Sequence, residues 1–135
     1  MKKVILFILS CLFLVACSKK SSDSTTSEFS NSLTFGTGLN QANLFQLTGT
    51  GTTFPKSTPI YFRLESQDDN AGSPVRIIIS KGDGTLYTLF DFTNPQSYGH
   101  IFLSNFSIPD AGNYTATGIL KTGNKIIATS PLTIQ

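Results

Sequence analysis

The stretch Ile60–Glu65, with the sequence IYFRLE, decides the fold class because apolar and polar side chains alternate along it without interruption. Successive side chains of a β-strand point to opposite faces of the sheet. The pattern therefore predicts a strand with one buried and one solvated face. Ile77 and Ile79 continue the buried set in the next apolar run, in which Ile78 is an outward-facing exception.

Similar runs follow one another along the rest of the chain. Segments rich in Ile, Phe, Val, Thr and Tyr alternate with clusters of Gly, Asn, Asp and Pro, and none has helical periodicity. This spacing is typical of strands joined by turns and predicts an all-β domain of seven to eight strands. Pro131 lies inside the last run, and because proline cannot donate to a ladder, that strand is expected to be an edge or to break there. The expected strands are Leu33–Phe35, Leu44–Thr48, Ile60–Ser66, Val75–Lys81, Leu86–Phe92, His100–Ile108, Asn113–Leu120 and Lys125–Ile134.

The N-terminus has a different character. Lys2 and Lys3 precede an apolar run of 13 residues, Val4–Ala16, which is shorter than the about 20 residues that span a bilayer and has the length of a signal-peptide core. Its end, Leu14-Val15-Ala16-Cys17, resembles the bacterial lipobox. The resemblance implies that residues 1–16 are a lipoprotein signal peptide and that Cys17 is lipidated. The alternatives are an ordinary secretory signal that leaves Cys17 as a free thiol, and a membrane-spanning anchor.

The segment that follows is expected to be a tether. Nine of the 15 residues in Ser18–Ser32 are Ser or Thr, and such a stretch buries too little apolar surface to offset the entropy of ordering. We therefore divide the chain into a signal peptide (1–16), a lipidated Cys with a flexible tether (17–32) and a β-domain (33–135). The lipobox resemblance implies a bacterial envelope protein held by its lipid, and Ser18 in place of Asp after the Cys favours the outer membrane.

Composition excludes several functions. Without residues 1–16 the chain has eight Lys or Arg (10 minus Lys2 and Lys3) and eight Asp or Glu, and no basic patch that would favour nucleic acid. Cys11 lies in the signal peptide and Cys17 is expected to carry lipid, so the domain has no disulfide, thiol nucleophile or Cys metal site. His100 is the only His, and zinc would have to rely on carboxylates. No catalytic motif appears, so we expect no enzyme, no metal and no cofactor.

A second resemblance concerns Asp110–Ala116, with the sequence DAGNYTA. It resembles the D-x-G-x-Y-x-C stretch of immunoglobulin-like domains, in which the Tyr hydroxyl bonds back to the turn backbone as a tyrosine corner. The resemblance implies this role for Tyr114, with Gly112 allowing the turn and Asp110 ordering the loop. It also implies an immunoglobulin-like Greek-key β-sandwich over residues 33–135, with a fibronectin-type or other Greek-key sandwich as the alternative.

The chain departs from that family at its disulfide. Ala116 stands where the second Cys is usual, Phe62 or Leu64 stands near the first, and an aliphatic residue around Ile77–Ile79 replaces the usual Trp. A disulfide contributes about 2–4 kcal/mol, and burial of one Phe or Leu side chain contributes about 1.5–3 kcal/mol. Packing is therefore expected to replace the cross-link.

The same resemblance implies a binding tip. In immunoglobulin order the loops Gln67–Ser73, Asn94–Tyr98 and Lys121–Asn124 would gather at one end, and their polar side chains suit recognition of a protein or glycan. Solvated turns are the alternative, and other candidate surfaces are the wet sheet face near Tyr61 and Arg63 and the last strand as an edge. The candidate binding residues are Asp68, Asp69, Asn70, Asn94, Gln96, Tyr98, Lys121 and Asn124.

The sequence leaves open whether the cluster around Asp68 and Asp69 binds calcium. The cluster offers several oxygens for calcium, but Asx-rich turns have the same composition.

The function expected is that of a membrane-anchored, non-catalytic envelope lipoprotein that binds an unknown protein or glycan. The alternative is a structural or accessory subunit of a larger envelope complex.

Overall fold

Ten β-strands and one short 3-10 helix account for the regular structure in this computed structural model, which describes residues 27–94 and 99–135. The predicted signal peptide, Cys17 and most of the predicted tether lie outside these residues. The elements are β1 (Ser32–Gly36), β2 (Gly38–Leu39), β3 (Leu47–Thr48), β4 (Thr53–Phe54), β5 (Ile60–Glu65), β6 (Val75–Lys81), β7 (Leu86–Phe92), β8 (Ile101–Phe106), β9 (Gly112–Leu120), η1 (Thr122–Asn124) and β10 (Lys125–Ile134).

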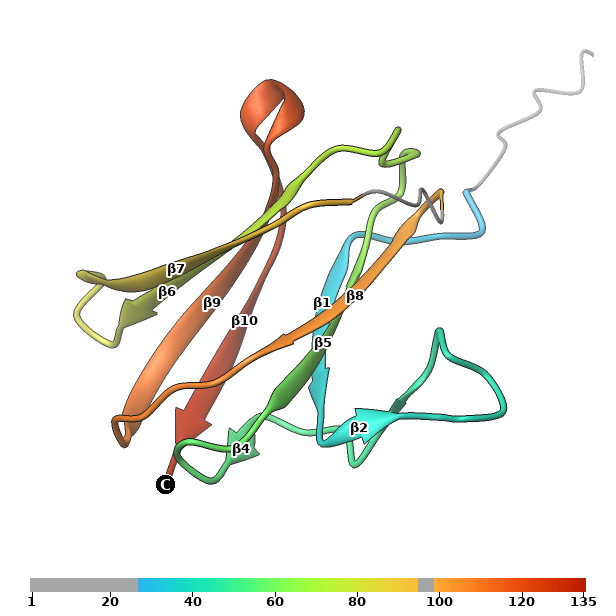
Figure 1. The fold of residues 1–135 in the computed structure, drawn as a ribbon. Helices are drawn as coiled ribbons and strands as arrows, with labels where there is room; N and C mark the ends of the chain where they lie inside the picture. Colours follow the sequence, from blue (N-terminus) through green and yellow to red (C-terminus); the bar gives the residue numbers. More distant parts are fainter. Residues whose placement is uncertain (1–26, 95–98) are drawn as a thin grey trace, which may run out of the picture.

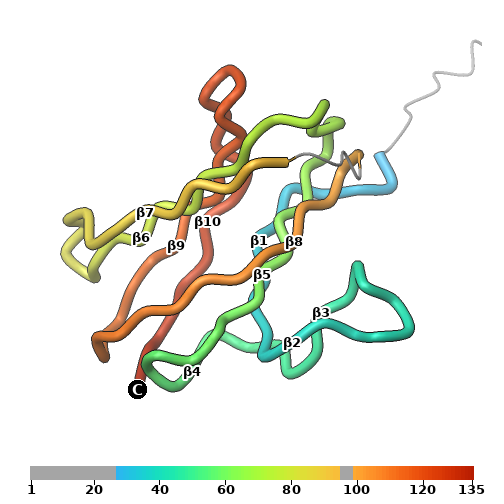
Figure 2. Tube along the Cα trace, viewed as in Figure 1, coloured from blue at the N-terminus to red at the C-terminus, as the bar shows by residue number. Residues whose placement is uncertain are grey.

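The strands form two main sheets that face each other, an arrangement consistent with a β-sandwich (Figure 1). One sheet has the order β1-β5-β8 and the other has the order β4-β10-β9-β6-β7. Their pairs are antiparallel except for β4 and β10, which run parallel. The chain passes from one main sheet to the other between β1 and β4, and again after β4, after β5, after β7 and after β8. The short pair β2–β3 forms an arm, residues 38–48, whose base lies beside the β1-β5-β8 sheet and whose tip extends away from it (Figure 2).

The core follows the alternation of IYFRLE. Ile60, Phe62 and Leu64 are at most 1% exposed, whereas the residues between them are half-buried on the other face. The Phe62 ring lies among Phe92, Phe102 and Phe106, with centroid distances of 5.2, 6.0 and 5.8 Å. Strands of both sheets thus meet around one aromatic side chain.

The predicted strand Leu44–Thr48 is wrong over most of its length. Only Leu47–Thr48 pairs in a sheet, and Leu44 is 61% exposed. The Asn40 and Asn43 side chains accept hydrogen bonds from backbone N–H groups two residues further on, at 2.9 and 3.1 Å. Asn side chains that bond locally offer the backbone an alternative to a ladder, so this apolar segment folds as a loop.

The remaining predicted strands coincide with observed strands to within two residues at each end. The prediction did not include the two-residue strands β2 and β4, which are too short to show a pattern. Pro131 lies within β10 and pairs with Thr115 of β9 on one side only, because β4 reaches β10 no further than Thr133 and Ile134. On its other side no described strand forms a ladder with Pro131, although the neighbouring Ser130 hydroxyl donates to the Leu33 carbonyl of β1. The missing N–H of the proline is therefore tolerated at this position.

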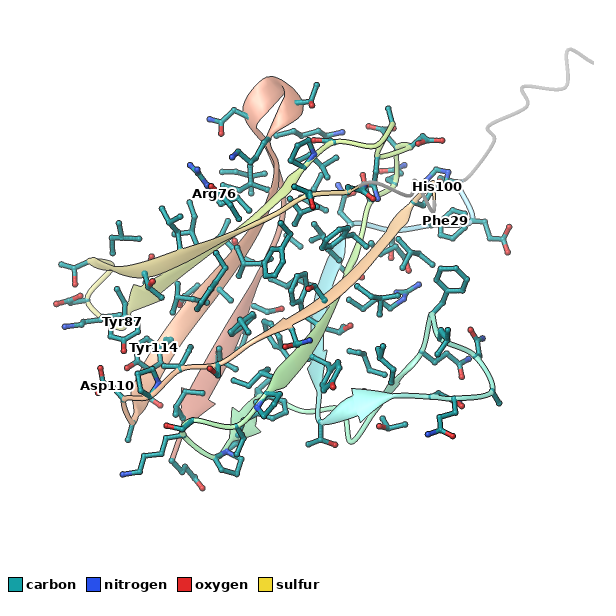
Figure 3. All side chains as sticks on the ribbon, viewed as in Figure 1. Phe29, Arg76, Tyr87, His100, Asp110 and Tyr114 are labelled. Atoms are coloured by element: carbon teal, nitrogen blue, oxygen red, sulfur yellow. The ribbon has the colours of Figure 1, made fainter. Side chains whose placement is uncertain are left out.

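A tyrosine-rich corner precedes β9. The Tyr114 hydroxyl donates to the carbonyl oxygen of Asp110 at 3.1 Å, which is the bond that the resemblance implies for this position. The Tyr87 hydroxyl donates to the Asp110 carboxylate at 2.5 Å, and the two tyrosine rings pack 5.0 Å apart (Figure 3). A Cβ at Gly112 would lie 3.3 Å from the Tyr114 ring, so a glycine leaves room for it. No motif in the sequence indicates the part that Tyr87 takes in this corner.

Tyr114→Phe should lower the free energy of unfolding by about 1 kcal/mol, because it removes one hydrogen bond and leaves the ring in place. Urea denaturation followed by circular dichroism measures this loss. Tyr61→Phe is the matched control, since the Tyr61 hydroxyl makes no hydrogen bond to any residue that the structure describes. Equal losses in the two variants would contradict the corner.

The Tyr87 hydroxyl should lose its proton at a higher pH than an ordinary tyrosine does. Its hydrogen bond to the Asp110 carboxylate raises the pKa of Tyr87 from 10.0 to about 12. The neutral phenol is the donor, so the bond is complete below the ordinary pKa and is lost as the pH rises through the higher value. Asp110→Asn keeps an acceptor but removes the charge, and the pKa of Tyr87 should fall. The difference in tyrosinate absorbance between the chain and Tyr87→Phe isolates this group, and a pKa unchanged in Asp110→Asn would refute the assignment.

Candidate binding surfaces

The described residues of the loops predicted to form a binding tip, namely 67–73, Asn94 and 121–124, lie at one end of the molecule, which we call the loop end (Figure 1). Ser73, in the connection between β5 and β6, holds two of the other segments. Its carbonyl accepts from Asn94 at 3.3 Å, and its hydroxyl accepts from the Thr122 backbone at 3.0 Å. The Asn70 backbone donates to Gly99 at 2.7 Å. The loop end is therefore cross-linked by hydrogen bonds.

Charged side chains reinforce these links. Arg76 forms a bidentate ion pair with the Asp91 carboxylate, at 2.7 and 2.8 Å. The Lys121 ammonium contacts the same carboxylate at 3.1 Å. Lys125 pairs with Asp68. The Arg76 hydrogen bond holds the pKa of Asp91 well below its usual value, and the Lys125 hydrogen bond lowers the pKa of Asp68. Both carboxylates thus stay charged at neutral pH.

The individual predictions fare differently. Asn70 is only 3% exposed, so its amide does not face solvent, and neither of its side-chain polar atoms has a hydrogen-bond partner among the described residues. Asn94 is half-buried and bonded to Ser73. Asn124 is exposed in η1 with a φ of 51°, a conformation that Asn tolerates. Gln96 and Tyr98 lie outside the described residues.

The acidic cluster uses its oxygens within the loop. The Asp69 carboxylate accepts from the Ala71 backbone at 2.7 Å, which makes an Asx turn, and Asp68 pairs with Lys125. Within residues 27–94 and 99–135, no three His, Cys, Asp or Glu side chains are grouped to hold a metal ion. The local geometry is that of the turn which was the alternative to a calcium loop.

The N-terminal residues dock on the same end. The Ser27 hydroxyl donates to the Gln67 carbonyl at 3.0 Å, and the Gln67 backbone donates in return to the Asn31 side chain at 2.8 Å. The Ser30 backbone donates to the Glu65 carboxylate at 2.7 Å. Residues 27–32, which the sequence placed in the flexible tether, are therefore attached to β5 and its following loop.

An aromatic stack accompanies these bonds. Phe29 lies parallel to the His100 ring, with centroids 4.2 Å apart and an interplanar angle of 6° (Figure 3). Nδ1 of His100 lies 3.0 Å from the Ser66 carbonyl oxygen, so this nitrogen carries the proton. The single histidine of the chain thus holds the N-terminal segment in place.

A second surface lies on the flank of the molecule. The arm and the outer face of the β1-β5-β8 sheet enclose a groove of about 750 Å³, which we call the arm groove. It includes Arg63, on the wet face that the sequence named as another candidate surface. Arg63 forms an ion pair of 2.5 Å with Glu65. The lining residues are Leu33, Thr34, Phe35, Asn43, Phe45, Gln46, Leu47, Thr50, Gly51, Thr52, Arg63, Ile101 and Ser130.

The ion pair at this groove is partly buried. Burial raises the pKa of Glu65, but the hydrogen bonds from the Ser30 backbone and from Arg63 outweigh that effect, and the pKa of Glu65 lies below its usual value. Glu65 is therefore ionised at neutral pH and balances the Arg63 charge. The same carboxylate also ties the N-terminal segment to the sheet that floors the groove.

Comparison with known proteins assigns no family: no family model matches the chain, and no curated protein matches it. Over the part of the chain that the structure describes, no helix has the length and apolarity needed to cross a membrane.

Phe29→Ala should release the N-terminal segment. Aromatic pairs contribute about 0.5–1.5 kcal/mol beyond their burial, and without the stack the bonds from Ser27, Ser30 and Asn31 should open more often. Amide hydrogen exchange at Ser30 and Gln67 measures this opening, and both amides should exchange faster. Leu44→Ala, at an exposed arm position, is the control. Unchanged protection of both amides in Phe29→Ala would contradict the role of the Phe29–His100 stack in holding the N-terminal segment.

Proposed function

We propose that the protein is a lipid-anchored, non-catalytic binding module of the bacterial envelope, built on an immunoglobulin-like sandwich. The strand order supports this fold. If β5, β6, β7, β8, β9 and β10 correspond to strands B, C, C′, E, F and G, then β1-β5-β8 matches A-B-E and β10-β9-β6-β7 matches G-F-C-C′. The bond from Tyr114 to Asp110 at the start of β9 agrees with this correspondence.

The anchor and the docked N-terminal segment together constrain orientation. From the lipobox Cys17 to Ser27 the chain has ten peptide units, which reach at most about 36 Å. Because Ser27 and Phe29 are attached to the loop end, that end stays near the membrane. The loop end, which corresponds to the tip that carries the binding loops in antibody variable domains, would therefore face the membrane. A partner would instead approach the flank that carries the arm groove.

The arm groove is the observation that carries the binding function. Its volume of about 750 Å³ falls within the roughly 300–1,000 Å³ of typical ligand sites. It combines apolar side chains with amides, hydroxyls and one guanidinium, which is the usual mixture in a recognition site.

The edge strand β7 favours a second candidate function, that of an accessory subunit in a larger envelope complex. Leu86 and Leu89 on this strand are 60% and 40% exposed, and β7 ends the five-stranded sheet. An unpaired edge with apolar side chains offers a surface for another protein.

Cys17→Ser should move the protein from the membrane fraction to the soluble fraction. The physical reason is that lipid attached to Cys17 supplies the apolar surface that holds the chain in the bilayer. Cell fractionation measures the distribution, and mass spectrometry of the native chain should detect a lipidated N-terminal Cys. Cys11→Ser, within the predicted signal peptide, is the control. An unmodified thiol at Cys17 would refute the anchor.

The two candidate functions can be separated by site-specific photocrosslinking in the native envelope. A crosslinker at Gln46 probes the arm groove, and one at Leu86 probes the edge of β7. Adducts at Gln46 alone favour the binding module, whereas adducts at Leu86 alone favour the accessory subunit. Repeated failure at both positions would contradict both functions.

A further inference from the structure

The arm groove has almost no net charge. Arg63 is the only charged residue among those that line it, and its guanidinium is paired with Glu65 at 2.5 Å. The Arg63 and Glu65 side chains are only 22% and 12% exposed, so solvent screens the pair incompletely. An anionic ligand would have to compete with Glu65 for Arg63, and a cationic ligand would meet Arg63 directly. The groove therefore suits a neutral ligand.

Two amides of the arm are already oriented for binding. The side-chain Oε1 of Gln46 accepts from the Asn40 side-chain amide at 3.2 Å, and the side-chain Oδ1 of Asn43 accepts from the Phe45 backbone N–H at 3.1 Å. The NH₂ groups of Asn43 and Gln46 make no hydrogen bond to any of the described residues. Fixed amides with available donors reduce the entropy cost of binding, and they suit ligand oxygens such as sugar hydroxyls.

The groove also offers apolar surface beside these donors. Phe45 is 39% exposed, and Leu47 and Ile101 are further apolar groups in the lining. The hydroxyls of Thr34, Thr50 and Thr52 lie in the same lining, on exposed residues. Apolar and hydroxyl groups side by side match the two kinds of surface that a sugar ring presents.

A peptide that added to β1 as an extra strand fits the groove less well, because the outer edge of β1 is already used. The Leu33 carbonyl accepts from the Ser130 hydroxyl at 2.6 Å, and the Phe35 carbonyl accepts from the Gly51 backbone at 3.2 Å. Peptide recognition at a sheet edge depends on such main-chain groups being open. The floor of the groove therefore presents side chains rather than a free strand edge.

From these observations we infer that the arm groove binds a neutral saccharide chain. Asn43 and Gln46 donate to its hydroxyls, Phe45 packs against a ring face, and the paired Arg63 leaves the site without net charge. The inference rests on the proposed binding function and specifies its ligand class.

Binding in the groove requires that the arm keep its position relative to β1. The close contact at Gly36 fixes this position. A Cβ at Gly36 would lie 2.5 Å from the backbone oxygen of Thr48 and 3.0 Å from Leu47, so the base of the arm packs directly on β1. Gly36→Ala must displace the arm, because the obstructing atom is backbone. This variant alters the groove without removing any of its donors.

Native gel electrophoresis through neutral polysaccharides tests the inference. The full mature chain, whose own side-chain charges nearly cancel, is solubilised with deoxycholate, which gives it a net negative charge, and is run in gels containing dextran, laminarin, xylan or galactomannan. At least one polymer should retard it. The double variant Asn43→Ala/Gln46→Ala, the single variant Phe45→Ala and Gly36→Ala should each weaken the affinity by about tenfold or more. Leu89→Ala, at an exposed position on β7, should bind as the parent does.

Several results would overturn the inference. Retardation by none of the four polymers, or retardation that is equal in all groove variants, would exclude a saccharide in this groove. Retardation by an anionic polymer such as alginate, and by none of the neutral ones, would refute neutrality. A protein adduct at Gln46 together with no retardation would preserve the proposed binding function while refuting the saccharide. Circular dichroism of each variant confirms that the sheets are intact.

Discussion

The packing of Phe62 and Leu64 between the two sheets is the constraint on which the rest of the structure depends. Both side chains are at most 1% exposed. Phe62 meets aromatic rings from β7 and β8, and Leu64 approaches β9 so closely that a Cβ at Gly118 would lie 2.5 Å from its methyl carbon. Near the positions where the family's disulfide is usual, the chain instead packs the large Leu64 side chain against Gly118. Close-packed interiors tolerate little change in volume, so this match sets the spacing of the sheets.

Much of the fold could be predicted because β-structure repeats every two residues. The alternation in Ile60–Glu65 predicted its strand and its buried face, and β10 was predicted with its observed bounds. The arm was not predicted because the apolar residues Leu44 and Phe45 favour a strand, whereas the side chains of Asn40 and Asn43 accept hydrogen bonds from nearby backbone N–H groups and stabilise turns instead. Such local hydrogen bonds leave no periodic pattern in a sequence.

The candidate sites were less predictable because they depend on contacts between distant residues. The sequence suggested which loops would meet, but the partners Arg76, Asp91 and Lys125 lie in strands whose patterns say nothing about pairing. The arm groove joins residues as far apart as Asn43 and Ser130. The solvated sheet face near Arg63, which forms the floor of the groove, could be inferred from the sequence. The wall that the arm forms could be seen only once the fold of the arm was known.

The proline within β10 has a consequence for contacts between chains. An exposed strand edge with a full row of donors is a template for intermolecular sheet growth. On β10 the Thr133 N–H points outward to Thr52, and alternate residues of a strand share that direction. Position 131 would therefore expose the next donor, and Pro131 removes it. Beyond the two residues that pair with β4, β10 therefore lacks one of the donors that an added strand would need.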